Sequence, residues 1–193
     1  MSKLSKIRDS FHKVINPFIL FLAKLKITPN MVTTSSLFFL AITVYFIIQK
    51  NLLLAGFFMI LTSVIDSLDG ALAKIVGSTK FGDFYDAFID RWVEVITFFA
   101  LSYAYPELYL LCFLALIFSL MTSYVAARAE VWTIGVKIKY VGTIGSRAGR
   151  LITLIAAMFF NQLALGLILI IIFASITMVA RTVVIMRTLR KKN

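Results

Sequence analysis

The sequence has few of the residues that disulfide-bonded or zinc-binding proteins require. It contains one cysteine, Cys112, and one histidine, His12. A single cysteine excludes an intramolecular disulfide, and the absence of a His or Cys cluster argues against zinc. Charged residues make up only 15% of the chain, against 61% hydrophobic residues. This composition excludes an ordinary soluble domain and predicts an integral membrane protein, in which Cys112 faces lipid or packs among apolar residues.

The few charges that are present are mostly basic. Lysine and arginine number 20 and aspartate and glutamate 9, for a net charge of +11. In a membrane protein the position of such charges indicates topology, so we expect no nucleic acid partner. The first apolar run begins well inside the chain and lacks a small-residue cleavage site. We therefore expect no signal peptide, and a single domain over residues 1–193.

Six apolar segments predict an all-α membrane protein with six transmembrane helices. The fifth segment is short for a bilayer. Ahead of the six-helix bundle of residues 27–193, the juxtamembrane region 1–26 has basic and apolar residues at helical spacing, which predicts an amphipathic helix on the membrane surface that carries His12. The first predicted helix follows a turn at 27–30 and runs to about residue 48, and the other five cover about residues 52–75, 81–104, 107–130, 147–160 and 163–185.

The distribution of basic residues predicts that both termini face the cytoplasm. Under this orientation the chain lies in the cytoplasmic membrane, and its outer turns carry only Lys50 and Glu107. The inner loops and the C-terminal tail carry Lys24, Lys26, Lys74, Lys80, Lys137, Lys139, Arg187, Arg190, Lys191 and Lys192.

Four aspartates interrupt the second and third apolar segments: Asp66, Asp69, Asp86 and Asp90. A carboxylate near mid-bilayer costs roughly 2.5 to 3.5 kcal/mol on insertion scales, so these side chains require compensation. The first two are three residues apart and the last two are four residues apart, so each pair lies on one helical face. Because the two helices leave a short loop in opposite directions, the four carboxylates can converge near the cytoplasmic surface.

Carboxylates so close together cannot all ionise unless cations or protons lie between them. A bound divalent metal ion is the simplest way to neutralise their negative charge. Ligands that are all oxygen favour magnesium, manganese or calcium. Two such cations close together suit phosphoryl transfer, which predicts a phosphorylated substrate. Gly70 and Ala73 leave space beside the acidic face for a nucleotide or a neighbouring helix, and Lys74 is placed to meet a phosphate.

The spacing of these residues resembles the signature of the CDP-alcohol phosphatidyltransferase family. The departure is Lys74, where the family usually has arginine, so a positive charge remains but the bidentate fork is lost. The resemblance implies transfer of a phosphatidyl-type group from a CDP-linked lipid to an alcohol, release of CMP, and a homodimer. The pattern reads Asp66-x-x-Asp69-Gly70-x-x-Ala73-Lys74 and, after seven residues, Gly82-x-x-x-Asp86-x-x-x-Asp90.

Carried over by position, the resemblance also implies the roles of individual residues. The four aspartates would bind two magnesium ions, with manganese as an alternative, and Asp90 would also deprotonate the incoming hydroxyl as general base. A carboxylate beside a metal can take that proton as the alcohol attacks. The segment ITPNMVT resembles a family turn that lines the CDP pocket. The positions expected to bind the CDP donor are Asn30, Thr33, Asp69, Gly70, Ala73, Lys74, Thr79 and Gly82.

Two further stretches, SYVAARAE at 123–130 and GSRAGRL at 145–151, resemble the branch that makes phosphatidylinositol phosphate or archaetidylinositol phosphate. In that branch two arginines and a lysine bind the acceptor's phosphate, and the position that is often lysine is Ala126 here. The favoured acceptor is inositol 1-phosphate; glycerol 3-phosphate, or a soluble CDP-inositol donor, remains open, as does an ester or ether lipid. The residues expected to bind the acceptor phosphate are Arg128, Arg147, Arg150 and Arg187, with Arg181 less favoured than Arg187.

Two other classes of function are open from the residues alone. Acidic residues within membrane spans also mark cation transporters, but here they gather at one depth and no polar path reaches the outer face. A membrane scaffold without catalytic activity would leave the energetic cost of burying the four carboxylates unexplained. Outside the signature, Asp83 is expected to cap the third helix or to stay solvated. Glu94, one turn beyond Asp90, is expected either to support the site or to pack against polar groups elsewhere.

Overall fold

The computed structural model describes residues 17–132 and 145–190, and within these ranges it contains helices and no strands. The predicted all-α class is therefore confirmed, while the predicted amphipathic helix and His12 lie mostly or wholly outside the described residues. Residues 17–24 are helical. The longer elements are α2 (Pro29–Ile48), α3 (Leu52–Val76), α4 (Lys80–Ala104), the short 3-10 turn η1 (Pro106–Leu108), α5 (Tyr109–Trp132), α6 (Arg147–Phe159) and α7 (Leu163–Arg190).

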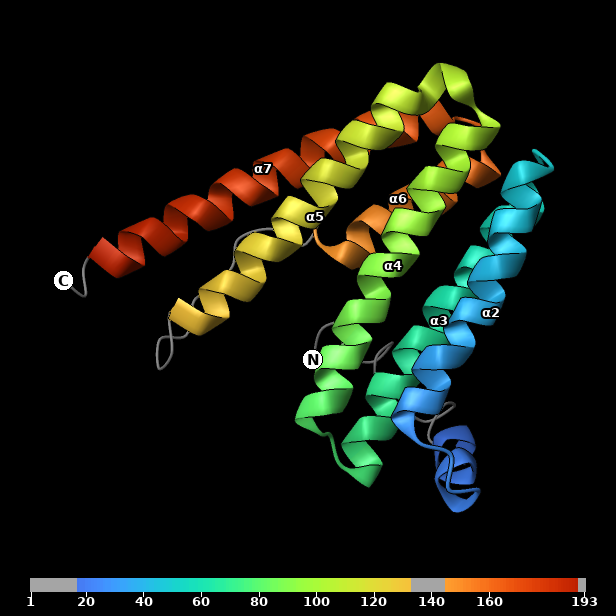
Figure 1. Cartoon of the computed structure of the whole chain (residues 1–193), viewed down its shortest axis with the longest axis vertical. Helices are drawn as coiled ribbons and strands as arrows, with labels where there is room; N and C mark the ends of the chain where they lie inside the picture. The colour runs from blue at the N-terminus through green and yellow to red at the C-terminus, as the bar shows by residue number, and fades with distance from the viewer. Residues whose placement is uncertain (1–16, 133–144, 191–193) are drawn as a thin grey trace, which may run out of the picture.

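The helices form two groups, which α6 and the packing of α4 on α5 connect (Figure 1). In one group α2 packs against both α3 and α4, and in the other α5 packs along α7. The η1 turn links α4 to α5 at the end of the molecule where the two groups meet. Helix α6 lies between them and packs on α7 on one side and on α3 on the other. The C-terminal ends of α5 and α7 point away from α3 and α4.

Several helices begin at a side chain that caps the first turn, which explains why their starts were predictable. Thr79 caps α4, because its hydroxyl accepts a hydrogen bond from the Gly82 backbone N–H at 3.0 Å. Of the two roles expected for Asp83, capping this helix or staying solvated, the structure shows the second, since Asp83 lies exposed in the first turn. The other capping residues are Thr28, Asn51 and Ser146.

In the described part of the chain, four segments are long and apolar enough to cross a membrane: Pro29–Ile48, Leu52–Val76, Pro106–Ala129 and Leu163–Arg190. Helix α4 is absent from this set, and its sequence carries several charged residues. Helix α6 has 13 residues, which makes it about 20 Å long at 1.5 Å per residue, against roughly 30 Å of hydrocarbon in a bilayer. Transmembrane helices are thus confirmed, and the count of six stays a prediction.

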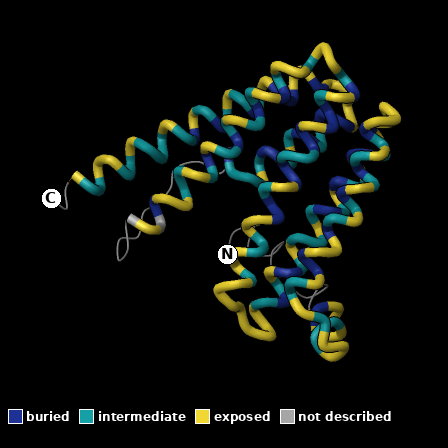
Figure 2. Tube along the Cα trace, in the orientation of Figure 1, coloured by how far each residue is buried: buried dark blue, intermediate teal, exposed yellow. Residues whose placement is uncertain are grey.

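The surface of the bundle is as apolar as a membrane environment requires. Large side chains such as Phe99 and Phe160 are 72% and 77% exposed, and exposed positions recur along the outer faces of the long helices (Figure 2). The main core lies where the two groups meet, around Met59 and Leu167, which are fully buried. Cys112 is buried in the same core. In lipid the outer faces need no further covering, because hydrocarbon is as apolar as these side chains.

Candidate active site

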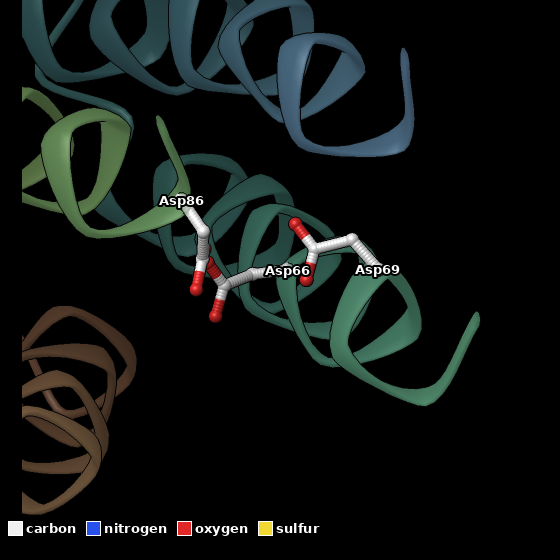
Figure 3. A group of neighbouring side chains, drawn as sticks. All are labelled: Asp66, Asp69 and Asp86. Atoms are coloured by element: carbon white, nitrogen blue, oxygen red, sulfur yellow. The ribbon is translucent and has the colours of Figure 1, made fainter. Parts of the chain in front are cut away.

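Three of the four predicted metal ligands come together at one point. Asp66 and Asp69 project from α3 and Asp86 from α4, and one carboxylate oxygen of each lies within 4.8 Å of the others. Figure 3 shows the three carboxyl groups directed toward one another. Helical spacing places Asp66 and Asp69 on one face of α3, and the short turn after Val76 reverses the chain so that α4 brings Asp86 to them. Three convergent carboxylates are a suitable donor set for a hard divalent cation.

Helix α2 holds one of these carboxylates in place. The hydroxyl of Thr33 donates a hydrogen bond of 2.5 Å to Asp69 Oδ2, and the two residues are only 2% and 3% exposed. Hydrogen bonds to an ionised acceptor are short and stronger than neutral ones, so this contact fixes the carboxylate firmly. Thr33 was predicted to bind the CDP donor. In this structure its hydroxyl is directed at Asp69, and its side chain also lines the adjoining cavity.

The fourth aspartate, Asp90, lies next to this group and is paired with Arg147. Arg147 Nη2 lies 2.5 Å from Asp90 Oδ1. The same guanidinium donates to both carboxylate oxygens of Asp66, at 2.8 Å from Nη1 and 3.1 Å from Nη2. Of the predicted acceptor-binding arginines, Arg147 is thus the one that the structure brings into contact with the aspartates. It joins the start of α6 to both acidic helices.

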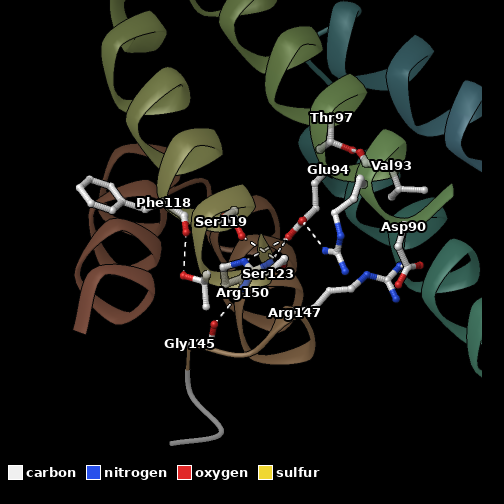
Figure 4. A network of polar contacts seen from close by, with 12 residues as sticks. Asp90, Val93, Glu94, Thr97, Phe118, Ser119, Ser123, Gly145, Arg147 and Arg150 are labelled. Carbon is white, nitrogen blue, oxygen red and sulfur yellow. Dashed lines mark hydrogen bonds and ion pairs between the residues drawn. The ribbon is translucent and has the colours of Figure 1, made fainter. Parts of the chain in front are cut away.

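Arg150, one turn further along α6, is arranged differently. It is 3% exposed and its guanidinium contacts Glu94, which is itself 6% exposed. Figure 4 shows this pair beside the Asp90–Arg147 pair. The sequence left the role of Glu94 between two alternatives. Its spacing from Asp90 was the only signal of a shared face, and nothing in the sequence identified Arg150 as its partner.

The structure does not bring the remaining predicted acceptor residues to the aspartates. Arg128 and Arg187 are exposed, in the C-terminal turns of α5 and α7 that point away from α3 and α4 (Figure 1). Arg181 is the α7 arginine nearer the start of α6. It lies one turn after Thr177, which packs against Gly145, and its Nη1 donates to the Thr122 carbonyl at 3.2 Å. The geometry thus favours Arg181 over Arg187 near the site.

A cavity of about 440 Å³ opens at one side of the aspartate cluster, where Asp69 and Asp86 line it. Gly70 borders it, and a Cβ atom built on Gly70 would meet no protein atom within 4 Å. Of the two explanations for this glycine, room for a ligand therefore fits better than contact with another helix. Lys26 and Ser78 also line the cavity, although the signature does not include them. The predicted donor residues that line it are Asn30, Thr33, Asp69, Gly70, Ala73, Thr79 and Gly82, together with Asp86.

Lys74 differs from the other predicted donor residues because it lines a second hollow. This groove, of about 710 Å³, runs between α3 and α6 and has mainly apolar walls. Gly70 lines both hollows, so the polar cavity and the apolar groove adjoin at this residue. The remaining lining residues are Ile60, Ser63, Val64, Ser67, Leu68, Ala71, Ile152, Ile155, Ala156 and Phe159.

This combination of an all-helical membrane fold, clustered aspartates and a cavity beside them agrees with a family match. The model of the CDP-alcohol phosphatidyltransferase family matches residues 26–186, and the chain belongs to that family. It is therefore a membrane-bound transferase of phospholipid synthesis. Membership in an enzyme family removes the support for the transporter and scaffold alternatives.

Named relatives point to one branch of the family. The archaetidylinositol phosphate synthase of Pyrococcus horikoshii is 34% identical over 179 residues, which cover 92% of this chain and 94% of the relative. The phosphatidylinositol phosphate synthase of Cutibacterium acnes is 30% identical over 169 residues, which cover 83% and 80% of the two chains. The predicted resemblance to this branch is thereby confirmed.

Solved structures of a Mycobacterium tuberculosis phosphatidylinositol phosphate synthase have the same fold. The structure with CDP-DAG bound superposes with a TM-score of 0.78 at 24% identity, covering 90% of this chain and 94% of that one. The complex of that protein with manganese and citrate gives a TM-score of 0.76 at 25% identity and covers 88% and 87%. The fold described above is therefore one that is known to carry these ligands in another protein.

Proposed function

We propose that this chain transfers a phosphatidyl-type group from a CDP-linked lipid to inositol 1-phosphate and releases CMP. The observation that carries the proposal is the meeting of a polar cavity and an apolar groove beside three convergent aspartates. A donor with a nucleotide at one end and lipid chains at the other needs two such compartments side by side. A soluble CDP-alcohol donor would make no use of the groove.

The donor is proposed to lie with its cytidine and diphosphate in the cavity and its chains in the groove. Gly70 borders both spaces, so the link between diphosphate and lipid would pass over it without meeting a side chain. Lys74 lines the groove next to Gly70 and is exposed, which suits contact with a phosphate oxygen at the junction. Asn30, Thr79 and Gly82 would bound the nucleotide on the opposite side.

Asp66, Asp69 and Asp86, with Asp90 beside them, are proposed to hold two magnesium ions, with manganese as an alternative. The convergent carboxylates support this assignment, and a structural neighbour was solved with manganese. Bound cations would neutralise the diphosphate and stabilise the CMP that leaves. Asp90 is proposed as the general base, because its carboxylate adjoins the cluster and can accept the proton of the attacking hydroxyl.

The acceptor's phosphate is proposed to bind Arg147, with Arg181 of α7 nearby. Arg147 lies in the first turn of α6, where free backbone N–H groups and the helix dipole also favour an anion. Its guanidinium already bridges Asp66 and Asp90, so a phosphate bound to it would hold the attacking hydroxyl next to Asp90. The relatives named as inositol phosphate lipid synthases support inositol 1-phosphate as the acceptor.

Orientation and assembly complete the proposal. Six membrane spans are proposed from the six apolar segments, and the basic residues of the inner loops support placing both termini and the active site at the cytoplasmic face. Under this orientation α4 and the short α6 cross the membrane within the bundle, where packing on neighbouring helices shields their polar side chains. A homodimer is proposed from the family resemblance.

The test is CMP release by the purified protein with magnesium and a CDP-linked lipid. Inositol 1-phosphate and glycerol 3-phosphate are compared as acceptors, and EDTA-treated protein and Asp90→Asn serve as controls. Metal-dependent release with inositol 1-phosphate supports the proposal. Release with glycerol 3-phosphate alone would refute the acceptor while keeping the chemistry, and release only with a water-soluble CDP-alcohol would refute the lipid donor.

Filling the groove should select against long lipid chains. Ala156 lines the groove from α6, and Ala156→Phe is expected to raise the KM for a long-chain CDP-lipid roughly fivefold or more, since overpacking costs about 1–3 kcal/mol. A short-chain donor that leaves this part of the groove empty should be unaffected. Ile172→Phe, on the exposed face of α7, is the control. An equal rise for both donors would place the lipid chains elsewhere.

Restoring the usual family residue at Lys74 should be tolerated. Lys74→Arg keeps the positive charge and adds a bidentate fork, so donor affinity is expected to stay constant or to improve. Titration with CDP-lipid measures this, and Lys74→Gln, expected to weaken binding, is the matched control. Loss of donor binding in the arginine variant would show that the junction accommodates only lysine.

A further inference from the structure

Two acidic residues of α4 face two arginines of α6 and form two ion-pair rungs. Asp90 and Glu94 are four residues apart on one helix, and Arg147 and Arg150 are three apart on the other, so each pair shares a face. The rungs join Asp90 to Arg147 at 2.5 Å and Glu94 to Arg150 at 2.5 Å (Figure 4). Helix α6 otherwise packs mainly on α7 and α3. Its alignment with α4 therefore depends on these long side chains.

The second rung is buried and its polar groups are extensively paired. Glu94 Oε1 accepts hydrogen bonds from Arg150 Nε at 3.1 Å and Nη2 at 2.5 Å, and Glu94 Oε2 accepts one from Arg91 at 3.0 Å. Arg150 Nη1 donates to the Gly145 carbonyl at 2.8 Å. Each nitrogen of the Arg150 guanidinium thus has a protein acceptor. In this structure the Arg150 guanidinium therefore joins Glu94 of α4 to Gly145, and none of its nitrogens is left without a protein partner.

The hydrogen bond from Arg150 to the Gly145 carbonyl connects this ion pair to the start of α6. Gly145 directly precedes Ser146, whose hydroxyl caps the helix by accepting from the Gly149 N–H at 3.3 Å. Gly145 also lies against α7, where an added Cβ would collide with the Thr177 side chain and the Phe173 carbonyl. The chain therefore enters α6 through a residue held by α7 on one side and by Arg150 on the other.

We propose that Glu94 is a positioning residue for the acceptor site. Through Arg150 and the Gly145 carbonyl it fixes the first turn of α6, and thereby the place of Arg147 relative to Asp66 and Asp90. Glu94 itself touches no substrate. The inference rests on the proposed role of Arg147 in binding the acceptor's phosphate. It predicts that disturbing the Glu94 rung weakens use of the acceptor and leaves binding of the donor intact.

The decisive variant removes both charges of the rung at once. Glu94→Gln alone would leave a buried arginine without its counter-ion, which is strongly destabilising, whereas exchanging both partners of a buried pair for apolar residues is often neutral. The double variant Glu94→Leu with Arg150→Leu is therefore expected to unfold in detergent near the wild-type temperature. Its KM for inositol 1-phosphate should rise about tenfold or more, because small displacements of a positioning group cost that much. Its KM for CDP-lipid should change less than about twofold.

Two further variants accompany this test, one with an intermediate change and one as a control. Glu94→Asp keeps the charge but shortens the side chain by one methylene, so its acceptor KM should lie between those of the wild type and the double variant. Glu107→Gln, in the η1 turn at the other end of α4, should match the wild type. A wild-type acceptor KM in the double variant overturns the inference, as do equal rises in both KM values. The absence of CMP release by the wild-type protein with inositol 1-phosphate would instead overturn the proposed function.

Discussion

Asp90→Asn is expected to abolish turnover and to leave binding of the CDP-lipid mostly intact. The amide is nearly the same size as the carboxylate but cannot accept the proton of the attacking hydroxyl, and loss of a general base costs about 10²- to 10⁴-fold in rate. Asp90 lies beside the group formed by Asp66, Asp69 and Asp86, so that group retains its carboxylates. CMP release measures the rate, and titration with donor in the presence of magnesium measures binding.

Asp66→Asn is the matched comparison, because it changes the same chemical group one helix away. Asp66 belongs to the convergent cluster and also accepts two hydrogen bonds from Arg147. Its replacement should weaken both metal and donor binding, in contrast with Asp90→Asn. Equal, mild losses of turnover in the two variants, with the same donor affinity, would contradict the roles assigned to both aspartates.

The positions of the helices were predictable because local signals agree with the fold. Predicted spans at 52–75 and 81–104 correspond to α3 at Leu52–Val76 and α4 at Lys80–Ala104. Apolar runs with polar turns between them fix such boundaries to within a few residues. The convergence of the aspartates was predictable for the same reason, since the short turn after Val76 reverses the chain and brings the first turns of α4 back toward the end of α3. The packing of both helices on α2, which holds them in place, was not visible in the sequence. Only the last predicted span was clearly too short, as α7 continues to Arg190.

Contacts between helices that are distant in the sequence were not predictable. Arg147 and Arg150 had the same sequence signature of a basic helix start, yet one contacts Asp66 and Asp90 and the other is buried on Glu94. Charge and spacing indicate which face of a helix a residue occupies, but its ion-pair partner depends on how α6 is placed against α4. Lys74 shows the same limit, because the motif assigns it to the nucleotide while the structure places it along the apolar groove.

The preference for Arg181 over Arg187 is a packing result of the same kind. Both residues lie on α7 at basic positions near the expected cytoplasmic end, and the sequence favoured Arg187. Gly145 packs against Thr177, which aligns the start of α6 with the turn of α7 that precedes Arg181. The contact exists because Gly145 has no side chain. A glycine in a loop is visible in the sequence, but the surface that approaches it is not.

Arg147→Gln is expected to cause a large loss in the use of the acceptor. The glutamine cannot bind a phosphate through a charged fork, and a hydrogen bond to a charged group is worth about 1.5–3 kcal/mol, or roughly ten- to a hundredfold in KM. The variant also frees Asp66 and Asp90 from their ion pairs with Arg147. Binding of magnesium should therefore persist or tighten, since two carboxylates lose a competing cation.

The measurements are the KM for inositol 1-phosphate, the KM for CDP-lipid and the affinity for magnesium in one preparation. Arg147→Lys keeps a point charge without the fork and should fall between the wild type and Arg147→Gln. Arg190→Gln, in the exposed last turn of α7, is the charge-matched control and should leave all three values unchanged. A variant Arg147→Gln that lost magnesium binding but kept its acceptor KM would reverse the assignment, because Arg147 would then serve to order the aspartates and not to bind the acceptor.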